Sequence, residues 1–462
     1  MDESIPRSQA ELRQKIIESR KIVDLYRPVI DAYIVDFFHL NLWNSLPPSW
    51  IRCFSKIPIQ HLPDLLSFEN RNSESNVWPL TVLALRSLFQ QLVHTRNKPT
   101  SQQHRTNRNC VFFKQSGLFK KSVKLKKRHE IERFADDCSR ESTCRTLVDI
   151  GSGQGNLART LAYGFGFRVC CLEQNVSFVQ VARKKDTELW LRLAKLEPNL
   201  KDIIHPVHLH EKVNLDHIDP IGFVQLLRDA LNVEKDQQAN PFQFGLIGLH
   251  PCGDLAPSLL RLFLACQECR FVKLVCCCYM KLSCKESISK TDAKQYGFPL
   301  SDFCRRTDLT LSYEAREMAC HAIEQYRDRL RTNYHELKIH AYRAAIESII
   351  VRLRPDLKHS GLKGGINATE ISFAEYCQRA VAGLDITVPQ EEIHAQETQL
   401  HLNRWEEVVK FYTIRLMFAP LIETIILYDR WIFLLEKDTN ARIDVLFDPY
   451  ISPRNHVITA YK

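Results

Sequence analysis

The sequence predicts an α/β protein whose central domain is a doubly wound parallel sheet, covered by helices on both faces. From Thr146 onward, short runs rich in Val, Ile, Leu and Cys alternate with longer helical stretches. These runs are apolar on both faces, which is typical of strands buried inside a parallel sheet. A glycine-rich segment, GSGQG at 151–155, follows the first run, at the edge where such sheets bind ligands. Together these features predict a Rossmann-like domain.

The alternation is interrupted, and this predicts an insertion in the sheet domain. The expected strands are TLVDI (146–150), RVCCLEQ (168–174), DIIHPVHL (202–209), FGLIGL (244–249), VKLVCCCY (272–279), IDVLF (443–447) and HVITAYK (456–462). Between the fifth and sixth of these, the chain has helical periodicity instead. The predicted organisation is therefore a helical N-terminal region (1–95), a flexible linker (96–113), the first part of the sheet domain (114–281), a mainly helical insertion (282–403) and the C-terminal part of the sheet domain (404–462).

Composition narrows the possible classes of partner. The 462 residues suggest two or three domains. A net charge of +9 fits a polyanion such as RNA, although many soluble proteins without such a partner are equally basic. The charged N-terminus shows no secretory signal, so we expect an intracellular protein. The apolar run 416–435 is broken by Pro420, Glu423, Asp429 and Arg430, which favours a buried helix over a membrane span.

The sixteen cysteines lie mostly in apolar, strand-like runs, so we expect buried free thiols. Cys266 and Cys269 have C-x-x-C spacing, but no second C-x-x-C or His pair completes a set of four ligands. No metal is therefore expected. Strand alternation predicts that Cys276 and Cys278 point to one face and Cys277 to the other.

The glycine loop favours a nucleoside with an amino-acid tail over a dinucleotide. Its spacing is G-x-G-x-G, whereas dinucleotide folds use G-x-G-x-x-G. Asp149, two positions before the first glycine, is placed to hold an ammonium group or its water shell. Glu173, at the end of the second strand, is placed to accept from both ribose hydroxyls. These features describe the S-adenosylmethionine pocket of a Rossmann-like methyltransferase. The expected cofactor-binding residues are Asp149, Gly151, Ser152, Gly153, Gly155, Glu173 and Gln174.

The fourth strand ends in LHPCGDLA and brings candidate catalytic residues to the same edge of the sheet. His250 is a candidate general base, because its ordinary pKa lies near neutrality. Cys252 is a further candidate catalytic residue at this edge. A thiolate of the fifth-strand cysteines, Cys276 to Cys278, would be a nucleophile for which the sequence identifies no base. Asp254 is either catalytic or the N-terminal cap of the next helix. Tyr279, after the fifth strand, either packs against a substrate base or completes the core.

A basic segment, KLKKRHEIERF, leads into the first strand and contains Lys126, Lys127, His129 and Glu130. Such a segment is usually a solvated face. Its position beside the cofactor domain also fits a phosphate-binding role.

Seven segments of the sequence resemble the methyltransferase-like protein 25 family, which includes members labelled ribosomal RNA adenine dimethylase domain-containing. In chain order they are KKRHEI, VDIGSGQGNLA, GLHPCGDLA, CCCYMKLS, YGFPLS, YRAAIE and LFDPYISPRNHVITAYK. The resemblance implies a seven-stranded methyltransferase sheet, S-adenosylmethionine at the glycine loop, Glu173 as the ribose acid and a KKRHE segment close to the pocket.

The fourth-strand motif separates this chain from N6-adenine methyltransferases, which end that strand in an Asn/Asp-Pro-Pro/Leu-Tyr/Phe type motif. HPCGD is more similar to a family of transfer-RNA ribose methyltransferases. We therefore expect an S-adenosylmethionine-dependent enzyme with RNA as its acceptor. The alternatives are a protein or small-molecule acceptor, or a non-catalytic module that binds cofactor or RNA.

Overall fold

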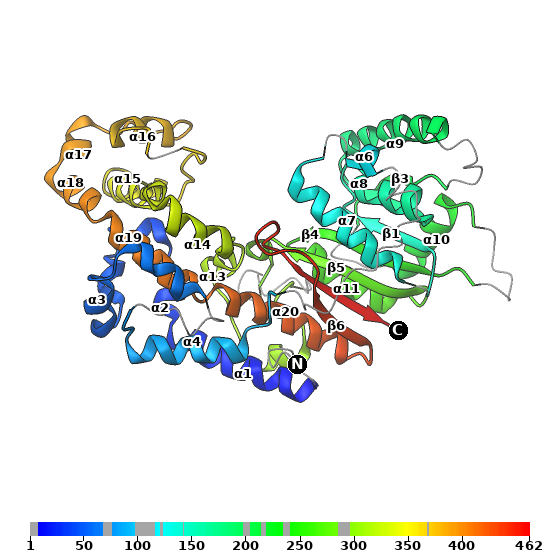
Figure 1. Cartoon of the computed structure of the whole chain (residues 1–462), viewed down its shortest axis with the longest axis horizontal. Helices are drawn as coiled ribbons and strands as arrows, with labels where there is room; N and C mark the ends of the chain where they lie inside the picture. Colours follow the sequence, from blue (N-terminus) through cyan, green and yellow to red (C-terminus); the bar gives the residue numbers. More distant parts are fainter. Residues whose placement is uncertain are drawn as a thin grey trace. The chain divides into compact units, whose positions relative to one another are not determined.

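The chain divides into two compact units, which are described separately. A computed structural model (Figure 1) describes residues 8–67, 76–97, 116–120, 123–141, 143–196, 204–213, 219–233, 241–284, 296–366 and 369–462. The helical unit comprises 17–94 and 311–424, and the sheet unit comprises 7–16, 95–310 and 425–462. Residues 282–310, which the sequence assigns to the helical insertion, thus group with the sheet unit. Residues 404–424, which it assigns to the sheet domain, group with the helical unit. Most of the predicted linker at 96–113 lies outside the described residues.

The sheet has seven strands in the order β3-β2-β1-β4-β5-β7-β6. The strands are β1 (Thr146–Ile150), β2 (Arg168–Glu173), β3 (Val207–His210), β4 (Phe244–Cys252), β5 (Cys269–Cys277), β6 (Asn440–Val445) and β7 (His456–Tyr461). Strands β1 to β5 are parallel, and β7 runs antiparallel to both of its neighbours. The predicted Rossmann-like, seven-stranded sheet of a methyltransferase is confirmed by this topology.

Helices cover the sheet, and the apolar strands form its core (Figure 1). The helices of this unit are α6 (Ser116–Lys120), α7 (Leu125–Ser139), α8 (Asn156–Arg159), the π-helical turn η4 (Thr160–Gly164), α9 (Val176–Leu196), α10 (Pro220–Ala230), α11 (Leu255–Ala265), η5 (Tyr279–Lys281) and α12 (Asp302–Arg306). Helix α11 packs on β4 and β5, while α9 packs on β2 and β3. Leu147, Phe134 and Val457 belong to one buried cluster that joins β1, α7 and β7.

Most strand boundaries differ from the sequence prediction by a few residues, and three of the differences have a local cause. Strand β3 begins at Val207, because Pro206 has no backbone N–H to pair with a neighbouring strand. Strand β4 continues to Cys252 through an irregular register after Leu249. Strand β5 ends at Cys277, since Cys278 has a left-handed backbone with φ of 52°.

The helical unit joins the N-terminal region to the predicted insertion. Its helices are α2 (Arg27–Ile30), η1 (Ile34–Asp36), η2 (Leu42–Ser45), α3 (Pro48–Phe54), η3 (Ile59–Leu66), α4 (Leu80–Leu92), α13 (Tyr313–Met318), α14 (Ile323–Thr332), η7 (Tyr334–Lys338), α15 (Ile339–Leu353), η8 (Pro355–Leu357), α16 (Phe373–Ala380), α17 (Gln390–His394), α18 (Gln396–Asn403) and α19 (Trp405–Leu416). The buried Arg415 links its segments by donating to the carbonyls of Ile30 and Glu314 at 3.3 Å and 2.7 Å. Both the N-terminal region and the insertion are therefore needed for its core.

Two helices extend across the division, α1 (Gln9–Leu25) and α20 (Ala419–Leu435). The continuous helical stretch Trp405–Leu435 is long and apolar enough to cross a membrane, and its most apolar window is entirely buried within the protein. The prediction of a buried helix at 416–435 is confirmed.

Candidate active site

The glycine loop follows β1 and approaches two neighbouring segments closely. The N–H of Gly151 donates to the carbonyl of Leu172 at 2.9 Å, which ties the loop to β2. Gly155 has φ of 69°, and a Cβ there would lie 2.6 Å from Cε1 of His208. Gly153 also has a positive φ, but it faces open space. Packing therefore requires the third glycine, whereas the second leaves its position open for a ligand.

Glu173 joins the end of β2 to this loop, as the sequence predicts. Its carboxylate is buried and accepts from the N–H groups of Gly153 and Asn175, each at 2.9 Å. Each carboxylate oxygen keeps a second lone pair for a ligand hydroxyl. Gln174 differs, since its side chain is exposed and its backbone carbonyl contacts His210.

Asp149 is a buried acid without a counter-ion in direct contact. Its side chain lies at the end of β1, 2% exposed, and no hydrogen bond reaches its carboxylate from the described residues. Burial, and then the negative charge of Glu173, raise its pKa from 3.8 to about 7, against a smaller opposing effect of Lys127. Nearby, the buried hydroxyl of Ser152 has no hydrogen-bond partner in the described chain. A buried acid with a raised pKa and an unpartnered hydroxyl, both beside an open glycine loop, are features expected of a ligand site.

A second buried acid, Glu130 of the KKRHE segment, has all its partners within the protein. Its Oε1 lies 3.0 Å from Nε2 of His250, accepts from Oγ of Ser452 at 2.6 Å and lies 3.8 Å from Nζ of Lys126. Burial alone would raise the pKa of Glu130, but the hydrogen bonds and charges of these partners lower it. This pair, the His250–Glu130 dyad, fixes one ring nitrogen of His250, while 27% of the His250 side chain remains exposed.

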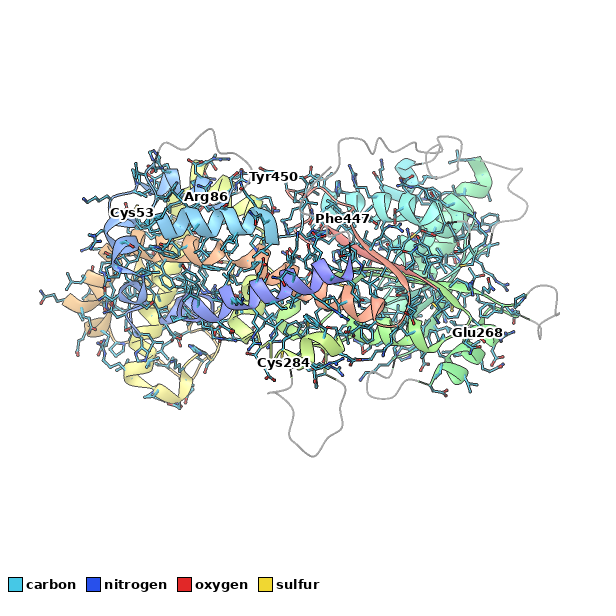
Figure 2. The ribbon with its side chains drawn as sticks, turned by 90° about the horizontal axis from the view of Figure 1, so that it is seen from below. Cys53, Arg86, Glu268, Cys284, Phe447 and Tyr450 are labelled. Carbon is cyan, nitrogen blue, oxygen red and sulfur yellow. The ribbon has the colours of Figure 1, made fainter. Side chains whose placement is uncertain are left out.

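His129 has a structural role. Its Nε2 accepts from the N–H of Asp448 at 3.0 Å, and its ring packs edge-on against Phe447. Burial and the charge of Arg133 lower its pKa, so the ring is held neutral as an acceptor. Phe447 and Tyr450 mark this segment after β6 in Figure 2.

The basic segment KLKKRHEIERF, at the start of α7, carries three exposed lysines, Lys124, Lys126 and Lys127. Lys127 lies close enough to lower the pKa of Asp149, so the segment lies near the glycine loop, as the resemblance implies.

Asp254 does not cap the following helix, although it occupies the N-cap position of α11. Its Oδ1 instead accepts from the N–H of Ser283 at 2.8 Å. The capping alternative is therefore wrong, and Asp254 holds the chain that follows β5.

Tyr279 completes the core. It is 1% exposed, and the guanidinium groups of Arg430 and Arg454 each lie 5.6 Å from the centre of its ring. Its ring is covered, so of the two alternatives the structure favours packing in the core over contact with a substrate base.

Cys252 lies with two cysteines from the end of β5. Its Sγ is 3.2 Å from that of Cys277 and 3.3 Å from that of Cys278. Hydrogen bonding from Cys277 lowers the pKa of Cys252 to about 6, with further contributions from Cys278, Lys281 and His250 that outweigh burial. The prediction that Cys277 and Cys278 point to opposite faces is wrong, because the strand ends between them and the left-handed Cys278 turns its thiol back.

Sequence reasoning missed Ser452 and the partnership of Glu130 with His250. Three of the motifs quoted above, KKRHEI, GLHPCGDLA and the closing LFDPYISPRN, converge at this point. The available signal was that all three motifs belong to the family resemblance. Their spacing along the chain does not reveal which of their side chains meet.

Comparison with known proteins identifies the segment that contains most of these residues. Residues 126–285 match a protein-family model described as a methyltransferase domain. "Probable methyltransferase-like protein 25" of Mus musculus is 33% identical over 224 residues, and that of Homo sapiens is 32% identical over 223 residues. Each match covers 47% of this chain, but only 37% and 36% of the relatives' own lengths. The resemblance to this family is confirmed over the matched segment, which is similar to a methyltransferase domain.

A solved structure, coclaurine N-methyltransferase bound to N-methylheliamine and SAH, aligns over 98% of this chain and 100% of its own. Its sequence identity is 13% and the TM-score is 0.24, so this likeness carries no argument.

Proposed function

We propose that this chain is an S-adenosylmethionine-dependent methyltransferase whose acceptor is RNA. The observation that carries the proposal is Asp149, a buried carboxylate near the end of β1 with a raised pKa, against which the described residues set no counter-ion in direct contact. Burying an acid in this way is costly unless a ligand supplies the missing positive charge. The ammonium of an amino-acid tail is such a group.

The residues around Asp149 fit the remainder of that cofactor. The free lone pairs of Glu173 suit the two ribose hydroxyls, and the unpartnered hydroxyl of Ser152 suits a further polar atom. The open side of Gly153 allows a ligand to pass close to the backbone. When bound, S-adenosylmethionine supplies an electrophilic methyl group together with its own leaving group.

His250 is suited to take up the proton that the acceptor loses. It lies near the carboxyl end of the parallel β4, at the same edge of the sheet as the glycine loop. Glu130 orients the ring, because its Oε1 lies 3.0 Å from Nε2 and leaves the other ring nitrogen to face the acceptor. Positioning the acceptor and removing its proton are the main tasks left to the protein.

A polyanionic acceptor is supported by the charges near this edge. Lys124, Lys126 and Lys127 are exposed at the start of α7. A hollow of about 200 Å³ between α6, α8 and α9 includes Lys185, Arg192 and the acidic Glu188 in its lining. Arg159 also lines it, but its guanidinium is paired with Asp186 at 2.6 Å. Clustered Lys and Arg side chains bind phosphate backbones through charge.

Transfer of a labelled methyl group tests the proposal. The full chain is incubated with methyl-labelled S-adenosylmethionine and either total RNA, nuclease-treated RNA or a protein fraction. We expect label in intact RNA, none after Asp149→Ala or His250→Ala, and normal labelling for the exposed control His394→Ala. Label confined to protein would rule out RNA as the acceptor but would leave the methyltransferase activity standing. Cofactor binding without labelling of any fraction would favour the non-catalytic module.

Salt dependence gives an independent test of the RNA partner. Binding of single-stranded RNA is measured by fluorescence anisotropy at several salt concentrations. Replacing Lys124, Lys126 and Lys127 by Ala is expected to flatten the log–log slope by about 0.7 for each phosphate that these lysines neutralise. An unchanged slope would show that these lysines do not contact RNA.

A further inference from the structure

The ends of β4 and β5 bring three thiols to one point. The Sγ atoms of Cys252, Cys277 and Cys278 are separated by 3.2, 3.3 and 3.6 Å. Thiols are weak hydrogen-bond donors and acceptors, so hydrogen bonding alone gives little reason for three of them to converge. The edges of a tetrahedron of sulfurs around Zn²⁺ measure about 3.8 Å, given Zn–S bonds of about 2.3 Å. A small outward movement of each sulfur would therefore create three zinc ligands.

The backbone of both loops is shaped around this point. Cys278 has φ of 52° and His250 has φ of 69°, which are uncommon conformations for residues other than glycine. Gly253 lets the loops approach each other, since a Cβ there would lie 2.7 Å from the carbonyl oxygen of Lys281. The carbonyl oxygen of His250 also faces the cluster, 3.5 Å and 3.7 Å from two of the sulfurs.

Exposure distinguishes two members of this cluster from the core cysteines. Among the cysteines that the structure describes, Cys252 is the exposed one and Cys278 is half-buried, while Cys277 is buried beneath them. The others in the sheet strands, such as Cys170, Cys171 and Cys269, are buried and fill space as small apolar residues.

We propose that Cys252, Cys277 and Cys278 bind one Zn²⁺ ion, which clamps the end of β4 to the end of β5. Across the described part of the chain, no further His, Cys, Asp or Glu atom joins this cluster, so the fourth position of the tetrahedron is open to water or to a substrate atom. On binding, Zn²⁺ forms three bonds to sulfur, and the protons still held by the thiols are released to solvent. The proposal is independent of the methyltransferase assignment, because it requires no cofactor or acceptor.

Metal titration of the full chain tests this site without cofactor. Reduced, chelator-treated protein is titrated with Zn²⁺ against a chromophoric chelator, and separately with Co²⁺ to detect thiolate-to-cobalt charge-transfer absorption. We expect one ion per chain for the wild type and a thiolate-to-cobalt band. Cys252→Ser and Cys278→Ser are each expected to lose more than the roughly 10- to 100-fold in affinity that removal of an outer-shell partner costs.

Two controls separate loss of ligands from loss of fold. Cys276→Ala alters the adjacent strand residue and Cys320→Ser a half-buried cysteine of the helical unit, and both should bind Zn²⁺ normally. Circular dichroism must show that Cys252→Ser remains folded. Failure of the reduced wild type to bind Zn²⁺, or unchanged binding by Cys252→Ser and Cys278→Ser, would overturn the proposal. So would the finding that the reduced chain binds no metal and forms only a Cys252–Cys277 disulfide on exposure to an oxidant.

Discussion

Two buried carboxylates of the sheet unit, Asp149 and Glu130, have opposite electrostatic situations. Glu130 contacts His250, Ser452 and Lys126, and these partners lower its pKa despite burial. Asp149 is equally buried but faces another acid, Glu173, and its pKa rises to about 7. A buried charge needs a partner. Glu130 has its partners in the chain, whereas the proposed function assigns the partner of Asp149 to a ligand.

The same contrast assigns different tasks to the two acids. Glu130 acts on the chain's own His250 and is a positioning residue. Under the proposed function, Asp149 binds the ammonium group of the cofactor. Substitution of Glu130 should therefore change the rate of methyl transfer, and substitution of Asp149 should change the affinity for the cofactor. A Glu130 variant that changes both quantities would contradict this division of roles.

The largest effect is expected at the His250–Glu130 dyad. His250→Ala should lower the rate of methyl transfer by roughly 10²- to 10⁴-fold, the usual contribution of a general base. Glu130→Gln should lower the rate in the same direction, because the amide cannot stabilise a charged imidazole. Single-turnover transfer measures the rate, and calorimetric titration with the cofactor measures its affinity.

The dissociation constant of the cofactor is the discriminating quantity for both variants. It should remain unchanged for His250→Ala, for Glu130→Gln and for the exposed control His394→Ala. A weakened affinity after Glu130→Gln would show that this acid serves the cofactor pocket as well.

The next largest effect is expected for Asp149→Asn. Loss of one charge-assisted hydrogen bond costs about 1.5–3 kcal/mol, so cofactor affinity should fall roughly 10- to 150-fold. The free protein should at the same time become more stable near neutral pH, since an uncompensated buried charge is removed. Calorimetric titration and thermal unfolding measure the two effects, with Asp328→Asn, an exposed acid of α14, as the control. Unchanged affinity would remove the basis for the proposed pocket.

The pH dependence of cofactor binding sharpens the comparison further. Asp149 of the free protein is protonated below about pH 7, and an ammonium ligand requires the ionised form. Affinity should therefore level off above that pH and fall by about tenfold per unit below it, until the lower pKa of the bound state is reached. Asp149→Asn should abolish this slope and leave only the titration of the ligand itself. A slope that persists in the variant would assign it to another group.

The stability of the free protein should have the opposite dependence on pH. Folding raises the pKa of Asp149 from 3.8 to about 7, so the folded state holds this proton more tightly than the unfolded state. The resulting stabilisation is complete below about pH 4 and is lost as the pH rises to about 7.

Much of the fold and half of the site follow from local patterns in the sequence. Strands such as 146–150 and 168–173 were predictable because their apolar runs and bounding turns are local features. The glycine loop and Glu173 were predictable for the same reason, since a strand end fixes where the adjacent residues lie. Asp149 was identified by position, although its lack of a partner is visible only in three dimensions.

The His250 dyad and the thiol cluster could not be predicted from local patterns. Glu130, His250 and Ser452 come from segments more than a hundred residues apart, and they meet through sheet topology. The thiols were missed because strand alternation fails where β5 ends, at Cys278. A search for C-x-x-C spacing identified Cys266 and Cys269 instead, which are both buried.

The smallest effect is expected for Lys127→Ala. Lys127 is exposed and acts on Asp149 through charge alone, and such interactions contribute about 1 kcal/mol or less. Cofactor affinity should therefore fall less than roughly fivefold, and the difference should disappear at high salt, where exposed charges are screened. Lys124→Ala removes an exposed charge that does not act on Asp149, and it should leave affinity unchanged. A loss of tenfold or more that persists at high salt would show that the ammonium of Lys127 contacts the cofactor directly. The cofactor would then form two charged contacts with the chain, one with Asp149 and one with Lys127.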